Sequence, residues 1–229
     1  PSAADFFGRS VGIYSTHIIV GSYLDDDMGS AAGVAFIFQK SGGSWSQMQK
    51  LYASDAAAID FFGISVSIAE NKAVIGAYGD DDKGSSSGSS YVFELSSGTW
   101  SQVKKFTATD GDANDQFGSV VHISDKFVVN GASWYEGVGT NSGSVYVSNI
   151  LPILPLDPYA NEIQLLSDDP QNSDQFGNSL SSSNDYVIVA SNLDDTGVYA
   201  NHGTIFVYKT YNKGVSFTQI AKFAPLNGS

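Results

Sequence analysis

Hydrophobic and polar residues alternate in short runs along this chain, and no stretch of useful length repeats with a helical period. The clearest alternation covers residues 62–68, 73–77, 90–95 and 100–106. Turn-forming residues separate these runs: two short polar segments at 69–72 and 96–99, and a longer segment rich in Gly, Asp and Ser between them. The pattern predicts four strands joined as a meander, and an all-β chain.

This unit occurs four times. The tetrad Asp-x-Phe-Gly recurs at intervals of 55, 55 and 59 residues, beginning at Asp5, Asp60, Asp115 and Asp174. A second glycine follows each tetrad at a nearly constant distance, as Gly33, Gly88, Gly143 and Gly203. Because the same aspartate precedes every Phe-Gly, we expect it to have a repeated structural role, such as an Asx turn between blades, rather than a catalytic one.

A unit of about 55 residues with four meandering strands has the size of one propeller blade. We therefore predict a single β-propeller domain of four four-stranded blades, with repeats at approximately 1–55, 56–110, 111–169 and 170–229. The count fits a small closed ring, an excerpt of a ring of about six to eight blades, or one subunit of an assembly in which two chains complete the ring. The sequence leaves these three arrangements open.

Composition narrows the classes of partner. The chain has 229 residues, 42% of them hydrophobic, with 11 Lys and Arg against 24 Asp and Glu, for a net charge of −13. A chain this acidic is not expected to bind nucleic acid, because its negative charge repels the phosphate backbone. No apolar run approaches the roughly 20 residues that cross a bilayer, so membrane insertion is not expected. Cysteine is absent, which excludes disulfides and thiolate metal sites.

The order of motifs within a unit matches a known pattern. In the second unit Phe62-Gly63 precedes the sequence VIGAYGDDDKGSSSGSSYVF, which runs from Val74 to Phe93. A Phe-Gly pair, a strand ending in Gly-Ala, an acidic glycine-rich loop and Gly-x-x-Tyr-Val-Phe resemble the FG-GAP repeat of integrin α-subunit propellers and of many extracellular microbial and algal proteins. The resemblance covers the whole chain.

This resemblance implies a propeller located outside the cell or at its surface, acting in recognition, adhesion or assembly through contacts with another protein chain or a second copy. We expect such a module not to be an enzyme. Calcium-binding members of the family carry an Asp-x-Asp-x-Asp-Gly loop in the hairpin after the Phe-Gly strand. The corresponding hairpins here are short, as in Ala69-Glu-Asn-Lys72, and lack three spaced carboxylates. The calcium site of the family is therefore not carried over.

Acidic residues concentrate instead in the next loop of each unit. Calcium takes six to eight oxygen ligands, and adjacent aspartates need help from backbone carbonyls, serines and water to provide them. Two interpretations stay open: a solvated turn in which Asp caps backbone amides, and a weak calcium site. The candidate ligands are Asp25, Asp26, Asp27, Asp80, Asp81, Asp82, Asp194 and Asp195. No cofactor is otherwise expected.

Most aromatic residues recur at equivalent repeat positions, and periodicity places them in the core, including Phe6, Phe7, Trp45 and Trp100. Trp134 and Tyr135 differ, because they stand where other units have acidic loop residues, and Tyr23, Tyr78 and Tyr199 lie nearby in the corresponding loops. Exposed aromatics beside Asp and Asn can stack on sugar rings. This gives an alternative function as a carbohydrate-binding, lectin-like propeller.

The third unit also contains an apolar, proline-rich insertion where the other units have a short polar turn. Such a segment either covers its own blade edge or contacts another chain. The second possibility makes it a candidate assembly contact. Its candidate contact residues are Ile150, Leu151, Ile153, Leu154, Leu156 and Tyr159.

Overall fold

A computed structural model describes residues 4–137, 139–150, 162–183, 185–195, 202–211 and 216–225. The described residues contain strands and no helix. The first sheet is formed by β1 (Ser10–Tyr14), β2 (His17–Ser22), β3 (Val34–Ser41) and β4 (Ser44–Leu51). The second is formed by β5 (Ser65–Ala69), β6 (Lys72–Ala77), β7 (Ser89–Ser96) and β8 (Thr99–Phe106).

The other two sheets repeat this arrangement. The third consists of β9 (Val120–Ile123), β10 (Phe127–Ala132), β11 (Ser144–Asn149) and β12 (Ile163–Leu165). The fourth consists of β13 (Phe176–Ser183), β14 (Tyr186–Ser191), β15 (Thr204–Lys209) and β16 (Thr218–Phe223). Every sheet is an antiparallel meander in chain order, so the prediction of four four-stranded blades is confirmed.

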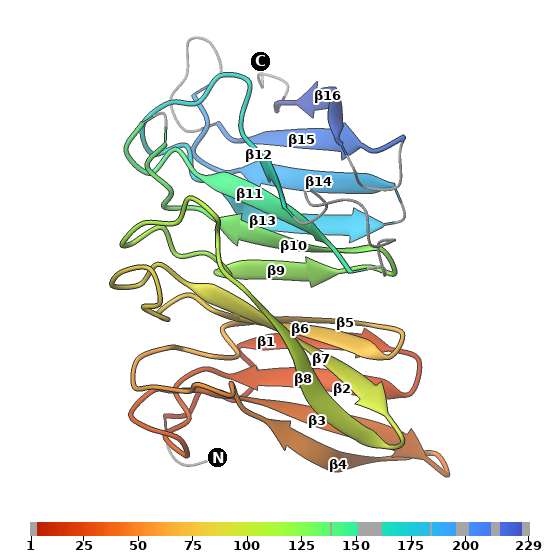
Figure 1. Ribbon diagram of the computed structural model, residues 1–229. Coiled ribbons are helices and arrows are strands. Elements are labelled where there is room, and N and C mark those ends of the chain that lie inside the picture. Colours follow the sequence, from red (N-terminus) through yellow and green to blue (C-terminus); the bar gives the residue numbers. More distant parts are fainter. Residues whose placement is uncertain are drawn as a thin grey trace, which may run out of the picture.

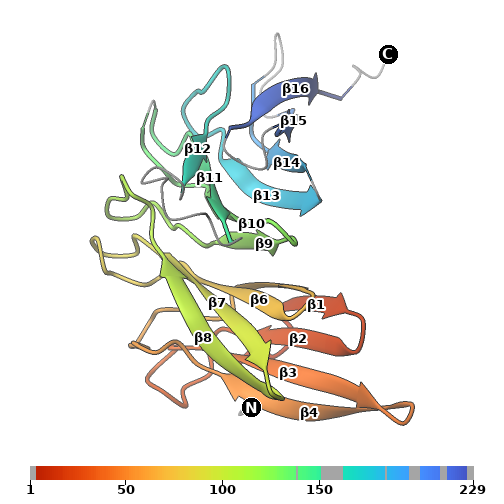
Figure 2. The same cartoon turned by 45° about the vertical axis from the view of Figure 1, so that its right-hand side comes forward.

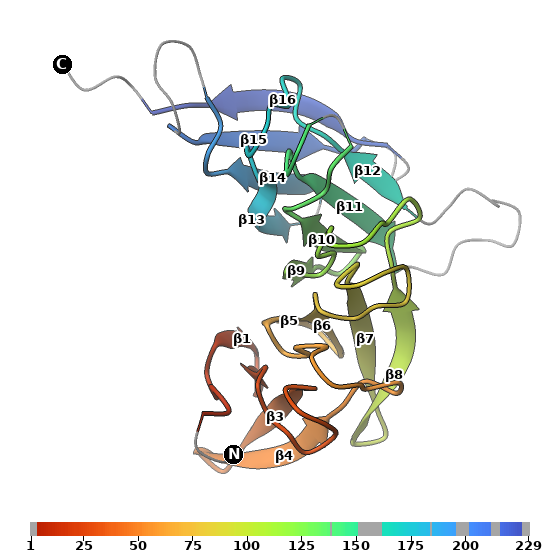
Figure 3. The same cartoon turned by 90° about the vertical axis from the view of Figure 1, so that its left-hand side faces the viewer.

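The four blades follow one another along an arc (Figures 1 and 2). The innermost strands β1, β5, β9 and β13 lie next to one another in that order. Seen from the side, the first and fourth blades occupy the two ends of the arc (Figure 3). In the first three blades the long loops between the second and third strands gather on one face, which we call the loop face, and the tight hairpins between the first and second strands point to the other (Figure 1). This is a β-propeller architecture.

The hydrophobic core lies between consecutive blades. Between the first two, Ile19, Ala35 and Leu51 of the first blade are buried together with Phe62 and Val66 of the second. Equivalent clusters fill the second and third interfaces. Alternation along each strand explains this packing, because one side of a strand faces the preceding blade and the other faces the following blade. Each internal blade therefore needs two apolar faces.

Two glycine positions allow the blades to approach each other. Gly33 has a positive φ and forms a parallel bridge with Phe62 of the next blade. A Cβ at Gly33 would overlap the carbonyl oxygen of Phe62, and one at Gly21 would overlap that of Gly63. The recurrence of glycine in the sequence thus reflects close backbone contact between blades.

Not every predicted core aromatic is buried. Trp100 is buried as expected, whereas Trp45 at the corresponding β4 position is exposed. Phe6 and Phe7 are also exposed, although Phe62, which corresponds to Phe7, is fully buried. The reason is positional: in the described part of the chain, no blade lies in front of the first one to cover Phe7.

Candidate functional site

The aspartate of the Asp-x-Phe-Gly tetrad closes a turn. The carboxylate of Asp60 accepts a hydrogen bond from the amide of Ala57 at 2.7 Å, and Asp115 and Asp174 accept equivalent bonds. Burial raises the pKa of Asp60 to about 6, and the hydrogen bond from Ala57 opposes that shift. The geometry agrees with a structural role for this aspartate.

The first aspartate of each acidic loop is buried and organises the loop. Asp25 and Asp80 each accept the amide of the residue two positions later, at 3.0 and 3.2 Å. Their backbone carbonyls accept the amides of Gly33 and Gly88. Asp26 is exposed and accepts the amide of Ala31. These are the contacts of a capped turn.

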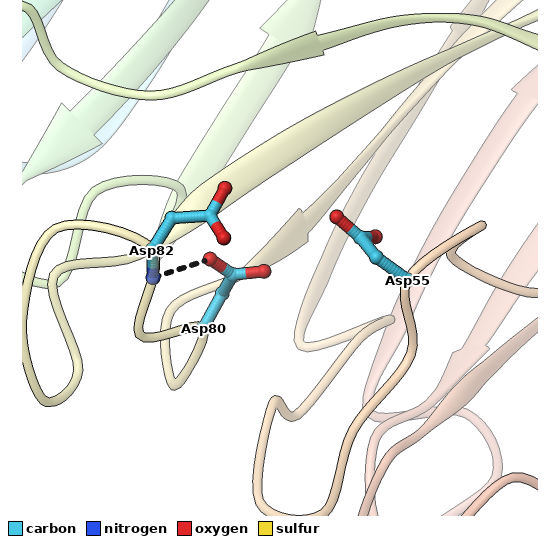
Figure 4. Close-up of side chains that lie close together, drawn as sticks. All are labelled: Asp55, Asp80 and Asp82. Atoms are coloured by element: carbon cyan, nitrogen blue, oxygen red, sulfur yellow. Dashed lines mark hydrogen bonds between the residues drawn. The ribbon is translucent and has the colours of Figure 1, made fainter.

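The second blade brings three of these carboxylates to one point. Asp80 and Asp82 come from the β6–β7 loop, and Asp55 comes from the connection out of the first blade (Figure 4). The ammonium of Lys105, on β8, donates to Asp55 at 2.7 Å, to Asp80 at 2.9 Å and to Asp82 at 2.6 Å. The hydroxyl of Tyr91 donates to Asp80 at 2.7 Å.

Lys105 compensates part of the negative charge of this cluster, in which one ammonium faces three carboxylates. Burial would raise the pKa of Asp80, but hydrogen bonds from Lys105 and Tyr91 and the charge of Lys105 bring it below its ordinary value. Burial likewise opposes the charge of Lys105, and its three carboxylate partners raise the pKa of the ammonium instead. The ammonium already fills the centre of the carboxylate group. The residues therefore do not fit an added calcium ion while Lys105 holds this position.

The other blades contain reduced versions of the cluster. In the first, Lys50 and Tyr52 both donate to Asp27. In the fourth, Lys222 donates to Asp168 at 2.9 Å. Lysine recurs at this repeat position as Lys50, Lys105 and Lys222, and this recurrence is a signal in the sequence from which the link could have been found.

In the third blade the cluster is neutral apart from one carboxylate. Gln164 replaces the lysine and donates to Asp110 at 3.0 Å. Tyr135 stands at the position of Asp80, and its hydroxyl donates to Asp110 at 2.9 Å, while Tyr146 donates to the other oxygen at 2.8 Å. The ring of Tyr135 also packs edge-on against Tyr146. Tyr135 is thus part of a blade contact, and its neighbour Trp134 is 42% exposed.

The remaining predicted site residues are dispersed. Asp81 and Asp82 are exposed, whereas Asp194 is buried and Asp195 is partly exposed. Ile150 packs against the core cluster between the second and third blades. Leu151, Ile153, Leu154, Leu156 and Tyr159 lie outside the described residues.

A row of aromatic rings crosses the loop face of the first two blades. Phe6 contacts Tyr23 at 5.7 Å between ring centroids, Tyr23 contacts Phe61 at 5.9 Å, and Phe61 stacks on Tyr78 at 5.0 Å. We call these four residues the aromatic row. Burial and the nearby Tyr23 raise the pKa of Tyr78, and the positive charge of Arg9 opposes that shift. Phe6 is the most exposed of the four.

The aromatic row is confined to one half of the arc. The same repeat positions carry Gln116 and Ser133 in the third blade and Gln175 and Asn192 in the fourth. The tetrad fixes the backbone equally in both halves, since Phe61, Gln116 and Gln175 all have a positive φ. The backbone of this loop therefore forms with or without aromatic side chains, and the aromatic row is not needed for its conformation.

The sequence matches the FG-GAP repeat family over residues 1–38, 45–93, 100–148 and 159–208. The chain belongs to this family. The matched ranges fall on the four blades, which confirms the resemblance found in the sequence. No curated protein sequence matches the chain. Among the described residues, no helix is long and apolar enough to cross a membrane.

Solved structures share the fold at low identity. A Lactobacillus plantarum protein has a TM-score of 0.54 at 13% identity, over 97% of this FG-GAP chain and 57% of its own. Saccharomyces cerevisiae Sqt1 has a TM-score of 0.50 at 12% identity, over 97% of the FG-GAP chain and 48% of its own. The Pseudomonas aeruginosa periplasmic gluconolactonase PpgL has a TM-score of 0.53 at 12% identity, over 96% of the FG-GAP chain and 58% of its own. The FG-GAP chain spans only part of the length of each.

The last of these structures corrects one expectation. We expected the FG-GAP chain not to be an enzyme, partly because a propeller of this kind implied a recognition module. A gluconolactonase with the same fold overturns that reasoning, because this arrangement of blades also occurs in an enzyme. At 12% identity the likeness concerns the fold alone, so it assigns no activity to this chain.

Proposed function

We propose that this FG-GAP chain is a recognition module that binds a partner protein through the loop face of its first two blades. The observation that carries the proposal is the aromatic row of Phe6, Tyr23, Phe61 and Tyr78. Four rings in series form a continuous apolar strip on an otherwise acidic protein with a net charge of −13. Aromatic residues are enriched at the centres of protein interfaces.

The row has features that packing alone does not require. The third and fourth blades build the same loop with polar side chains at these positions, so a blade folds without the rings. Arg9, the only arginine in the chain, lies close enough to influence Tyr78. Apolar rings beside a guanidinium favour a partner segment that presents apolar and acidic side chains. A location outside the cell or at its surface belongs to the same proposal.

A library of random linear peptides displayed on phage tests this proposal. We expect selection on the immobilised protein to enrich peptides that lose binding to the Tyr23→Ala, Tyr78→Ala double variant. Tyr211→Ala is the matched control, because Tyr211 is a highly exposed tyrosine outside the row. Failure to enrich any peptide, or enriched peptides that bind the double variant as well as the wild type, would contradict the proposal.

A second candidate is carbohydrate binding, favoured by the exposure of Trp134 on the loop face of the third blade. Tyr135 adds little to such a site, because its hydroxyl is bonded to Asp110 and its ring packs on Tyr146. A glycan array separates the two functions. Binding that is lost in Trp134→Ala supports a lectin, and no signal on any glycan removes this candidate.

A further inference from the structure

The two ends of the arc expose surfaces that are buried everywhere else. At one end, Val11 of β1 is 67% exposed, whereas Val66 at the same position of β5 is 7% exposed. Ile13 shows the same contrast with Ile68. Together with the exposed Phe7, Val11 and Ile13 form what we call the front surface.

The other end of the arc also exposes residues whose counterparts in the first blade are buried. Ile205 of β15 is 45% exposed, and its counterpart Ala35 of β3 is fully buried. Phe223 pairs with Ile205 across the sheet as Leu51 pairs with Ala35, and it is exposed while Leu51 is buried. Ile205, Phe223 and the exposed Ile188 form what we call the rear surface.

These two surfaces are the two halves of one blade contact. In the first internal interface, the counterparts of the rear surface are Ile19, Ala35 and Leu51. They are buried against Phe62, Val66 and Ile68, the counterparts of the front surface. The contact that would cover either end is therefore already present three times within the chain. A blade of this type would therefore fit each exposed surface.

We propose that a second copy of this chain docks its front surface on the rear surface of the first, and that two such contacts close the two arcs into one ring. One chain carries both halves, so a single kind of contact covers both exposed ends. A ring of the size of these solved propellers would hold two arcs of this length, since the chain spans 48–58% of those chains. This inference is independent of the aromatic row.

One residue makes the contact between copies differ from the internal ones. Gly21, Gly76 and Gly131 lie against the carbonyl oxygens of the next tetrad glycines, and a Cβ at any of them would overlap that oxygen. The fourth blade has Ala190 at this position. Its methyl group would meet Gly8 of the second copy, so the contact between copies is expected to be wider and weaker than those within the chain.

Sedimentation equilibrium of the chain and two end variants tests the proposal. We expect wild type to reach twice the 24.2 kDa of one chain as its concentration rises. Val11→Asp on the front surface and Ile205→Asp on the rear surface should each stay at the mass of one chain. Val103→Asp is the matched control, since Val103 is an exposed valine on β8 outside both surfaces. It should associate like wild type.

Mixing the two end variants tests whether the front surface of one copy contacts the rear surface of the other. The intact rear of Val11→Asp can still meet the intact front of Ile205→Asp, so an equimolar mixture should form pairs although neither variant does so alone. Ala190→Gly should lower the dissociation constant severalfold, because it removes the methyl group at the contact. Circular dichroism confirms that each variant is folded.

Four results would overturn the proposal. A wild type that keeps the mass of one chain at every concentration would mean that no second copy covers the ends. Masses that grow beyond two chains would exclude the closed ring. A mixture that stays monomeric would exclude front-to-rear contact, since it contains one variant with an intact front and one with an intact rear. An unchanged dissociation constant for Ala190→Gly would place this residue outside the contact.

Discussion

The second and third blades build the same link between neighbours with different chemistry. In the second, the ammonium of Lys105 joins Asp55 to two carboxylates of its own blade. In the third, Gln164 and Tyr135 hold Asp110, the counterpart of Asp55, through neutral donors. Both arrangements tie the end of one blade to the loop of the next.

The difference teaches what this position requires. A carboxylate from the preceding blade is kept in both cases, while its partners change from a cation to an amide and a phenol. The shared requirement is a hydrogen-bonded connection between blades, and charge is one way to make it. The two links differ in what remains when their donor is lost. In the second blade the carboxylates lose their compensating charge, whereas in the third blade only the exposed Asp110 is affected.

Lys105→Met should have the largest effect. It leaves Asp80 buried without its cation, and breaking a buried ion pair from one side costs about 3 kcal/mol. Gln164→Met in the third blade removes neutral hydrogen bonds and should cost about 1 kcal/mol. Urea denaturation measures both. Lys104→Met is the control, since Lys104 contacts the ring of Phe106. Equal losses for Lys105→Met and Gln164→Met would show that the charge adds nothing.

Two aspartates of the second blade should respond to pH in opposite ways. Asp80→Asn removes an ionised partner of Lys105 and should cost about 2 kcal/mol at pH 7. The pKa of Asp80 lies below its ordinary value, so this loss should persist down to pH 5. Asp60 is different, because burial raises its pKa to about 6. Its charge is unfavourable in the folded protein above that pH.

Asp60→Asn should therefore be neutral or stabilising at pH 7, and its advantage over wild type should shrink as the pH falls through about 6, where the native aspartate takes up a proton. Thermal melts of both variants between pH 5 and pH 8 provide the measurement. If the stability advantage of Asp60→Asn instead grew as the pH fell, the raised pKa of Asp60 would be contradicted.

Tyr135→Phe should have the smallest effect. It removes one hydrogen bond to Asp110 and leaves Gln164 and Tyr146 in place, for a loss of about 1 kcal/mol or less. Urea denaturation beside wild type and Trp134→Phe checks it. A loss as large as that of Lys105→Met would mean that the tyrosine carries the third-blade link alone.

The fold could be predicted from the sequence because its signals are local and repeated. The Asp-x-Phe-Gly tetrad and the second glycine recur in each unit, and each reports a close backbone contact between blades. The exposure of Phe7 could not be predicted in this way, since it depends on which blade lies in front. Periodicity places Phe7 and Phe62 in the same environment, and only the position of the blade in the arc separates them.

The lysine link was harder to find for a physical reason. Asp55 and Lys105 are 50 positions apart and belong to different repeats, so no local pattern joins them. The aspartates of residues 80–82 suggested a calcium site, because adjacent carboxylates indicate a cation without saying which one. The aromatic row was missed similarly: Phe61 and Tyr78 lie in separate loops, and their contact depends on the fold.

Calorimetric titration of calcium into wild type and Lys105→Met tests most directly the claim that a lysine serves as the cation of the second-blade cluster. The account predicts no calcium binding at this cluster in wild type, because the ammonium holds all three carboxylates. In Lys105→Met the three carboxylates lose the ammonium, and calcium should bind in its place and recover part of the lost stability. Binding to wild type that is abolished by Asp80→Asn would contradict the account.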